Sequence, residues 1–239
     1  MSRLSTISNR LSAGSDLALA TDPIAEQIAT ALEQDIVLGR LAPGQKLGEE
    51  ELAERFAASR HQVREGLSKL EKVGIATKER NRGFFVRRFS AEEVREIYEV
   101  REIIQRQAAL RISLPINPDT ISSLVAINER YEEAVARGDL RVIHETNDLF
   151  HDEIFRLCGN EALSSLVRHY MDLTYVIRSA GFADPENLEL SRRHHRIIIE
   201  LLQGKDSWAL AQICVDHIQP TKAQYLAILA DSEVERSTE

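Results

Sequence analysis

The sequence lacks the features that mark secreted, membrane-spanning or catalytic proteins. Its only two cysteines, Cys158 and Cys214, lie far apart without the spacing of a metal or redox motif, so we expect buried apolar thiols. The apolar runs are short and interrupted by charges, and none approaches the roughly 20 residues of a membrane span. Residues 1–22 have no continuous apolar core of the kind found in signal peptides. The sequence also contains no nucleophile elbow, phosphate-binding loop or HExxH motif. These absences predict a cytoplasmic protein that is not an enzyme.

Charge is distributed very unevenly along the chain. The net charge is -8, but residues 1–90 hold 14 basic and 12 acidic side chains, which leaves 16 basic and 26 acidic side chains for residues 91–239. Within the first part, residues 55–90 hold 10 basic and only 3 acidic side chains. A local excess of this size suits contact with phosphate groups, so the basic segment predicts a nucleic-acid interface.

Residues 22–89 predict a winged helix-turn-helix domain, preceded by a flexible arm over residues 1–21. A helix over about 23–38 begins at the cap-plus-proline signal of Asp22 and ends before Gly39. A short helix over 49–56 and a third helix from Ser59 to Gly74 follow. Two extended runs, 75–78 and 84–87, are joined by a glycine-containing turn and indicate a β-hairpin.

The third helix has the pattern of a DNA-reading element. Ser59 is expected to cap it, with Gln62 completing a capping box. Arg60 and Arg64 are four residues apart on one face, opposite the apolar stripe, so both can point into the major groove. Arginine suits this position because its planar fork can bond O6 and N7 of guanine together. The further candidates are His61 and Gln62 for base edges, and Ser59 and Lys69 for phosphates. A merely solvated basic helix face is the alternative interpretation.

From Ser90 onward the sequence predicts an all-α domain over residues 90–230, followed by a tail at 231–239. Ser90 forms a second capping box with Glu93, and Gly and Pro divide the remainder into segments. The expected six helices cover residues 91–114, 118–137, 139–158, 161–180, 185–203 and 206–229. The fold class is therefore mostly α: a winged helix-turn-helix followed by a six-helix bundle.

The first domain resembles the N-terminal domain of the GntR family. The resemblance rests on Gly39 to Gly44, Leu47, Glu51 to Glu54, Ser59-Arg60, Val63 to Glu65, Leu70-Glu71, Gly74 and Arg82 to Val86. It implies that Arg60 and Arg64 contact DNA and that Gly83 lies at the wing tip beside the minor groove, so Arg82 and Gly83 join the expected DNA-binding residues.

Four positions depart from the usual GntR pattern. His61-Gln62 stands where Thr-Pro is frequent, and Glu50 stands where many members carry a phosphate-contacting arginine. Gly66 replaces the usual alanine and should loosen the third helix by about 0.5 to 1 kcal/mol. The family's operator rules are therefore not expected to transfer directly.

The second domain resembles the FCD ligand-binding domain of the FadR subfamily, and the count of six helices is similar to its VanR-type branch. The resemblance rests on Tyr98 to Arg101, Asn147 to His151, Gly159-Asn160, His195 with Ile198, and His217. It implies a divalent metal ion held by Asn147, His151, His195 and His217, and an effector contacted by Arg101 and Asn147. For Arg101 the alternative is an exposed ion pair with neighbouring acids.

The residues alone support this metal site in part. Asn147 and His151 are four apart on one helix face, and imidazole nitrogens suit Zn, Ni, Cu or Fe(II). No carboxylate belongs to the set, because Asp148 is about 100° away around the helix. The charge of the ion is then left for an acidic effector to balance. Isolated satisfied or surface histidines are the alternative, and we expect His144 and His194 to be surface residues.

Together these patterns predict a homodimeric transcription regulator, and specifically a repressor. It would bind a palindromic double-stranded DNA operator and be controlled by a small organic acid bound in a metal-containing helical domain. Two alternatives are a metal-dependent hydrolase that uses the histidine cluster and a structural DNA-binding protein without a ligand cavity.

Overall fold

The computed structural model describes residues 22–182 and 184–238, and the predicted arm (1–21) lies outside this range. The first part, which we call the head (residues 22–89), contains α1 (Pro23–Val37), β1 (Lys46–Leu47), α2 (Glu49–Arg55), α3 (Arg60–Lys72), β2 (Ala76–Glu79) and β3 (Gly83–Val86). The three strands form one antiparallel sheet in the order β1-β3-β2. The predicted winged helix-turn-helix is therefore confirmed, with one addition: β1 was not predicted, because two residues carry no alternating pattern.

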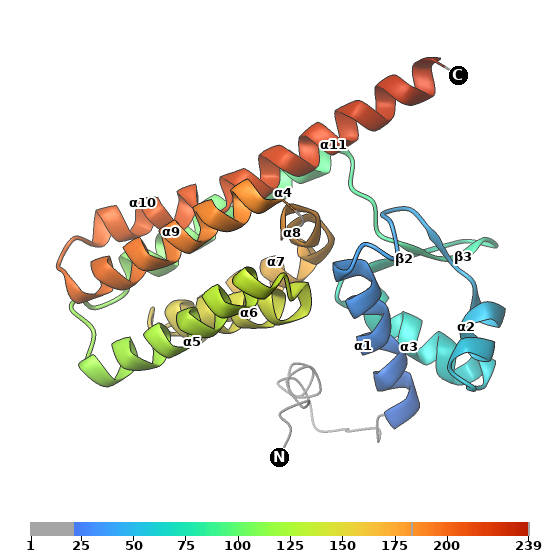
Figure 1. Ribbon diagram of the computed structural model, residues 1–239, viewed down its shortest axis with the longest axis horizontal. Helices are drawn as coiled ribbons and strands as arrows, with labels where there is room; N and C mark the ends of the chain where they lie inside the picture. Colours follow the sequence, from blue (N-terminus) through green and yellow to red (C-terminus); the bar gives the residue numbers. More distant parts are fainter. Residues whose placement is uncertain (1–21, 183, 239) are drawn as a thin grey trace.

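The remainder, which we call the helical domain, contains eight helices among the described residues. They are α4 (Ala91–Leu110), α5 (Pro118–Arg137), α6 (Leu140–Arg156), α7 (Glu161–Leu173), α8 (Tyr175–Phe182), α9 (Pro185–Gln203), α10 (Ser207–Asp216) and α11 (Gln219–Thr238). Figure 1 shows α4, α9 and α10 running together on one side of this domain, with α5, α6 and α7 on the other. No helix within residues 22–182 and 184–238 is long and apolar enough to cross a membrane.

The sequence signals at the helix ends act as expected. Asp22, Ser59 and Ser90 cap α1, α3 and α4 with their side chains, and the last two form complete capping boxes. Gly138 ends α5 in the left-handed conformation at φ 67°, which glycine adopts without strain. These local interactions explain why most predicted helix starts agree with the structure to within a residue or two.

Two of the predicted helices are in fact broken, and one is longer than expected. The segment 161–180 divides at Thr174 into α7 and α8, and the segment 206–229 divides at His217 into α10 and α11. The count of six was therefore wrong. The predicted tail was also wrong, since α11 continues to Thr238. Neither Leu173 nor Asp216 is adjacent to a glycine or proline. Pro220, in the first turn of α11, was a local signal for the second break that the sequence analysis did not use.

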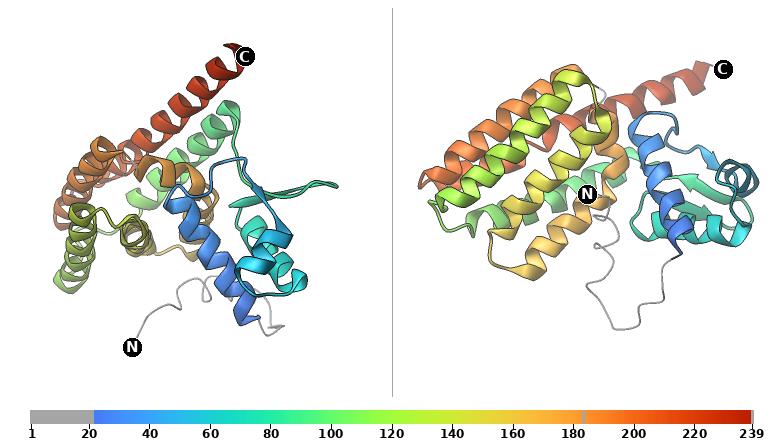
Figure 2. Two further views of the ribbon diagram at one scale, coloured as in Figure 1. Left: turned by 45° about the vertical axis from the view of Figure 1, so that its right-hand side comes forward. Right: turned by 60° about the horizontal axis from the view of Figure 1, so that its bottom comes forward.

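The head and the helical domain share one hydrophobic core. Leu32, Leu67 and Phe84 of the head belong to the same buried cluster as Ile177 of α8 and Tyr225 of α11. Hydrogen bonds also cross the boundary: the Tyr175 hydroxyl donates to the Glu33 carbonyl at 3.2 Å, and the Phe89 amide donates to the Tyr225 hydroxyl at 3.4 Å. In both views of Figure 2, α11 projects beyond the helical bundle on the side of the head.

Candidate functional site

Helix α3 presents two arginines on its outer face. Its apolar residues Val63, Leu67 and Leu70 are fully buried against the rest of the head. Arg60 and Arg64 point away from that core and are mostly exposed. Each arginine is paired with an acid at the start of α2: Arg60 Nη2 lies 2.8 Å from Glu50 Oε1, and Arg64 Nε lies 2.6 Å from Glu49 Oε2. The predicted basic face of α3 is thus present, and a glutamate of α2 lies beside each of its two arginines.

Two other predicted DNA contacts in α3, Gln62 and Lys69, also bond to residues of the head. Gln62 accepts hydrogen bonds from the Ser59 amide at 2.9 Å and hydroxyl at 3.0 Å, and its amide group donates to Asp22 Oδ2 at 2.9 Å. Lys69 Nζ lies 2.6 Å from Glu26, and only 11% of its side chain is exposed. In the absence of DNA, Gln62 and Lys69 are therefore held by partners within the head, and their predicted roles as base reader and phosphate contact stay predictions. Ser59 caps α3 while staying exposed, and His61 is exposed on its first turn.

The wing also follows the prediction in outline. β2 and β3 pair through Glu79 opposite Gly83, and Gly83 adopts φ 96° with open space around it. Arg82 forms an ion pair with Glu79 and stacks 5.1 Å above the Phe85 ring. The hairpin tip thus presents an exposed arginine, Arg82, that is paired with Glu79.

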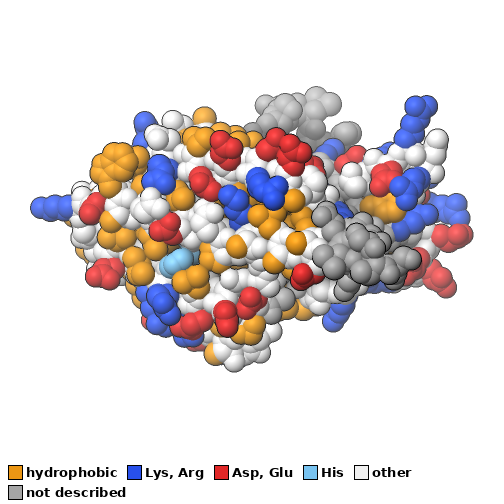
Figure 3. Space-filling view, turned by 90° about the horizontal axis from the view of Figure 1, so that it is seen from above, with side chains coloured by type: hydrophobic (Ala, Val, Ile, Leu, Met, Phe, Trp, Pro, Cys, Tyr) orange, Lys and Arg blue, Asp and Glu red, His pale blue; other side chains and the backbone are white. Residues whose placement is uncertain are grey.

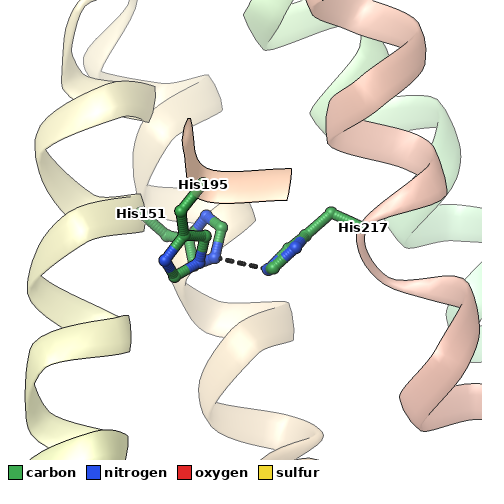
Figure 4. Close-up of side chains that lie close together, drawn as sticks. All are labelled: His151, His195 and His217. Carbon is green, nitrogen blue, oxygen red and sulfur yellow. Dashed lines mark hydrogen bonds between the residues drawn. The ribbon is translucent and has the colours of Figure 1, made fainter. Parts of the chain in front are cut away.

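Three histidines from three helical segments converge in the helical domain. His151 lies on α6, His195 on α9, and His217 at the junction of α10 and α11. At this interruption between the two helices the His217 ring points toward the other two histidines (Figure 4). One ring nitrogen of each histidine lies within 4.8 Å of one ring nitrogen of both others, and His151 Nε2 is 2.9 Å from His217 Nε2. The predicted grouping of His151, His195 and His217 is present in the structure, and the kink that places His217 was not predicted.

The environment keeps all three imidazoles neutral. His195 is fully buried and His151 nearly so, and burial lowers the pKa of each well below its ordinary value. Burial also lowers the pKa of His217, and the neighbouring histidines add to the effect. A neutral imidazole nitrogen is the form that binds a metal ion, so the cluster is ready to act as a ligand set.

The unsatisfied polar atoms of this region point to the same conclusion. His195 Nε2, His217 Nδ1 and Asn147 Oδ1 are buried without a hydrogen-bond partner. Buried polar atoms are almost always paired, so several orphans at one place indicate a group that binds there. Three imidazoles and an amide oxygen fit a divalent first-row ion such as Zn or Ni, which takes nitrogen and oxygen ligands.

Asn128 is a residue of this site that the sequence analysis missed. Its Oδ1 lies 3.2 Å from His195 Nδ1, and its amide group donates to Glu132 at 3.0 Å. Accepting from Nδ1 leaves His195 Nε2 free to face the cluster. Asn128 occupies the buried stripe of α5 between Leu124 and Tyr131, and a polar residue on an apolar stripe was the available signal.

A cavity beside the histidines is lined by two buried arginines, Arg101 and Arg178. Arg178 binds Asp148 at 2.6 Å. Burial opposes the charged form of Arg178, but Asp148 outweighs it and raises the pKa of Arg178. Arg101 donates to the Thr174 hydroxyl at 3.0 Å, and burial lowers the pKa of Arg101 to about 10. The alternative of an exposed ion pair for Arg101 is therefore wrong, because the side chain is buried in the cavity wall.

The cavity is small, and Asn147, His151 and His217 line it together with the arginines. Its volume of about 30 Å³ is roughly the space of two water molecules. It opens between helices of the bundle, where side chains from distant parts of the sequence meet.

His144 and His194 differ from the surface residues we expected. His144 is buried, with its ring 4.2 Å from that of Tyr175 and its Nδ1 3.6 Å from Asp148 Oδ2. His194 is half-buried, and its ring centroid lies 5.8 Å from that of His217. The expectation for both was wrong, because α6 and α9 are covered on more of their circumference than the apolar pattern indicated.

Comparison with known families assigns both parts of the chain. The model of bacterial regulatory proteins of the gntR family matches residues 24–86, and the FCD domain model matches residues 96–220, more than half of the chain. The chain belongs to the GntR family. It is a DNA-binding transcription regulator whose FCD domain binds a ligand. The resemblance of its two parts to the GntR and FCD domains is confirmed, while its similarity to the VanR-type branch stays a prediction.

Curated relatives extend over most of this GntR regulator. It is 28% identical over 193 residues to the uncharacterized HTH-type transcriptional regulator YdhC of Bacillus subtilis. The alignment covers 80% of this chain and 86% of the relative. It is also 28% identical over 199 residues to the HTH-type transcriptional repressor RspR of Escherichia coli. That alignment covers 83% of this chain and 87% of the relative. Such relatives are regulators and not enzymes, so the hydrolase alternative is not supported.

Solved structures share the fold at low sequence identity. McbR/YncC of Escherichia coli superposes with a TM-score of 0.68 at 20% identity and covers 89% of this chain and 99% of that one. A putative GntR regulator from a Rhodococcus species gives a TM-score of 0.70 at 21% identity, with coverages of 85% and 97%. The arrangement of head and helical domain is therefore that of known GntR regulators.

Proposed function

We propose that this GntR regulator is a homodimeric repressor of a palindromic operator, released by a small organic acid that binds beside a divalent metal ion. The single observation that carries the proposal is the cluster of His151, His195 and His217 beside a cavity that Asn147 and Arg101 also line. A regulator needs a ligand cavity away from its DNA-binding face, and this cavity provides one.

The metal ion would be held by the three imidazole nitrogens and the Asn147 amide oxygen. When bound, the ion supplies a positive charge and an open coordination position for an acidic ligand. Asn128 would hold His195 in the required orientation, as hydrogen-bond acceptors behind metal-binding histidines commonly do. Zn and Ni both suit this ligand set.

An acid is the expected effector because the cavity carries uncompensated positive charge. Asp148 neutralises Arg178, whereas no carboxylate among the described residues lies within ion-pair distance of Arg101. All ligand side chains are neutral, so a divalent ion would add its full charge to that of Arg101. A carboxylate that reaches both would relieve the cost of burying them.

Helix α8 supports a physical link between the cavity and the head. Arg178 and Phe182 of α8 line the cavity, while Tyr175 and Ile177 of the same helix contact the head. Arg101 also binds Thr174, the residue that precedes α8. A cavity of this size must expand to admit an organic acid, so effector binding would displace α8 and change the position of the head. Only a difference in effector affinity between the two positions would produce regulation.

Exposed hydrophobic side chains support a homodimer. Ile103 on α4 is 56% exposed and Trp208 on α10 is 68% exposed, and these two helices pack against each other. Figure 3 shows hydrophobic side chains on the upper face of the helical domain. We expect Trp208→Glu or Ile103→Glu to shift the protein toward monomer in sedimentation velocity, whereas Leu166→Glu on α7, also exposed, would leave the dimer intact. A wild-type protein that sediments as a monomer at all concentrations would contradict the dimer.

The metal site is tested by thermal melting with added NiCl₂ or ZnCl₂. At a metal concentration about 100 times Kd the stabilisation is about 2.7 kcal/mol, or a rise of about 5 to 11 °C in Tm. His217→Asn should lose most of that rise, and EDTA should reverse it in the wild type. His169→Asn changes an exposed histidine on α7 and serves as the matched control. An equal rise in all three proteins would contradict the site.

The effector is tested with the metal-loaded protein and a panel of mono-, di- and tricarboxylates. A member of the panel should raise Tm further and weaken operator binding in fluorescence anisotropy. DNA should weaken binding of that acid by the same factor, as linkage requires. Arg101→Gln should keep the response to metal and lose the response to acid. If Arg101→Gln responds to acids as the wild type does, the role of Arg101 is refuted while the metal site stands.

A further inference from the structure

The first turn of α2 carries three consecutive glutamates at a place where negative charge opposes DNA binding. In a helix-turn-helix the first helix crosses the DNA backbone and the second enters the major groove. Glu49, Glu50 and Glu51 begin α2, and Glu50 lies beside Arg60 of α3. At the head end of the molecule, Figure 3 shows acidic side chains among the basic ones.

Stability of the head does not account for the contact between Arg60 and Glu50. The Arg60 side chain is 67% exposed and that of Glu50 is 87% exposed. Exposed ion pairs of this kind contribute little to folding. Near DNA, however, the carboxylate would be repelled by phosphates. A carboxylate at this place is therefore unexpected if the surface serves only to attract the DNA backbone.

The pair has the hydrogen-bonding pattern of a reader of G·C base pairs. The Arg60 guanidinium offers only donors, which match O6 and N7 of guanine. The Glu50 carboxylate offers only acceptors, which match the N4 amino group of cytosine. A phosphate group offers acceptors alone, so it can pair with Arg60 but not with Glu50. Together the two side chains favour the edge of a G·C pair over the backbone.

We propose that Glu50 is a specificity-determining residue that orients Arg60 toward guanine and itself accepts a hydrogen bond from cytosine in the operator. This inference rests on the proposed placement of α3 in the major groove. Glu49 has a different role, because its side chain is only 23% exposed and it holds Arg64 at 2.6 Å. Both glutamates hold an arginine, but only Glu50, whose side chain is 87% exposed, can also reach a base.

The test selects operator duplexes from a random pool with wild-type protein and with Glu50→Ala, Glu50→Gln, Arg60→Ala and Arg64→Ala at one salt concentration. The wild type should select cytosine at one position of each half-site. Glu50→Ala should lose that preference, with a change of roughly 5- to 150-fold in discrimination against other bases. Glu50→Gln should move the preference toward adenine, whose N6 and N7 match an amide. Glu51→Gln removes an exposed charge from the same turn and should select as the wild type does.

Two results would overturn the inference. In the first, the Glu50 variants select the same sequences as the wild type. In the second, they bind every duplex more tightly by one common factor with a steeper salt dependence, which would make Glu50 only a repeller of phosphates. Failure of the underlying placement has its own signature: Arg60→Ala and Arg64→Ala would then both leave base preference unchanged. Circular dichroism and Tm equal to those of the wild type would show that the exposed substitutions leave the fold intact.

Discussion

Gly66 lies where α3 crosses α1, and replacing it with alanine separates two opposing effects. A Cβ at this position would lie 2.9 Å from the backbone oxygen of Ala25 and 3.1 Å from Cβ and Cγ2 of Ile28. Gly66 is buried within regular helix, so alanine also improves helix propensity. The sequence alone suggested only this second effect, a loosening of the helix by glycine.

The magnitudes favour destabilisation by Gly66→Ala. The gain in helix propensity is about 1 kcal/mol. Inserting a methyl group into a closely packed contact costs about 1 to 3 kcal/mol, and the nearest atom here is a backbone oxygen that cannot rotate away. The net expectation is a loss of about 0 to 2 kcal/mol in the free energy of unfolding, or up to about 8 °C in Tm.

Urea unfolding followed by circular dichroism measures this change directly. Ser68→Ala is the matched control, because it raises helix propensity in the same helix without adding a carbon at the crossing. The control should be neutral or slightly stabilising. A Gly66→Ala protein stabilised by about 1 kcal/mol would show that propensity alone governs this position, and the reasoning from close packing would then be refuted.

Three further predictions concern the helical domain. Asp148→Asn leaves the buried Arg178 without its counter-charge and should cost about 3 to 5 kcal/mol in thermal or urea unfolding; a loss below 1 kcal/mol would contradict the buried pair. Asn128→Ala should weaken Zn or Ni binding by about 10- to 100-fold in competition with a chromophoric chelator, because His195 loses its orienting acceptor; unchanged affinity would remove Asn128 from the site. Burial raises the pKa of Cys214 to about 12, so this thiol should resist iodoacetamide until the protein is unfolded, and rapid labelling of Cys214 in the native protein would disprove its burial.

Local signals in the sequence were enough to predict the helices and the β-hairpin of the head and most helix starts, but not the two-residue strand β1. The capping boxes at Ser59 and Ser90 act within four residues, so the sequence determines them without reference to the fold. The grouping of His151, His195 and His217 came from the FCD resemblance, and their convergence is present in the structure.

The features that the sequence could not predict depend on partners far along the chain. Lys69 was expected to contact phosphate, but its partner Glu26 is 43 residues away. Gln62 binds Asp22 over a similar separation. The helix break at Thr174 has no glycine or proline next to it, so no local sequence signal predicts it. In each case the outcome depends on tertiary packing, and the local periodicity of the sequence does not contain that information.

The core shared by the head and the helical domain has a consequence for folding. Tyr225 and Ile177 complete the apolar cluster on which Leu32 and Leu67 pack, so removing the helical domain would expose the base of the head to water. The two parts should therefore unfold in one cooperative transition, and amide protons of the head should become more protected from exchange when a ligand binds the distant cavity. The head of this GntR regulator therefore depends on the helical domain for its stability and is not an independently folding domain.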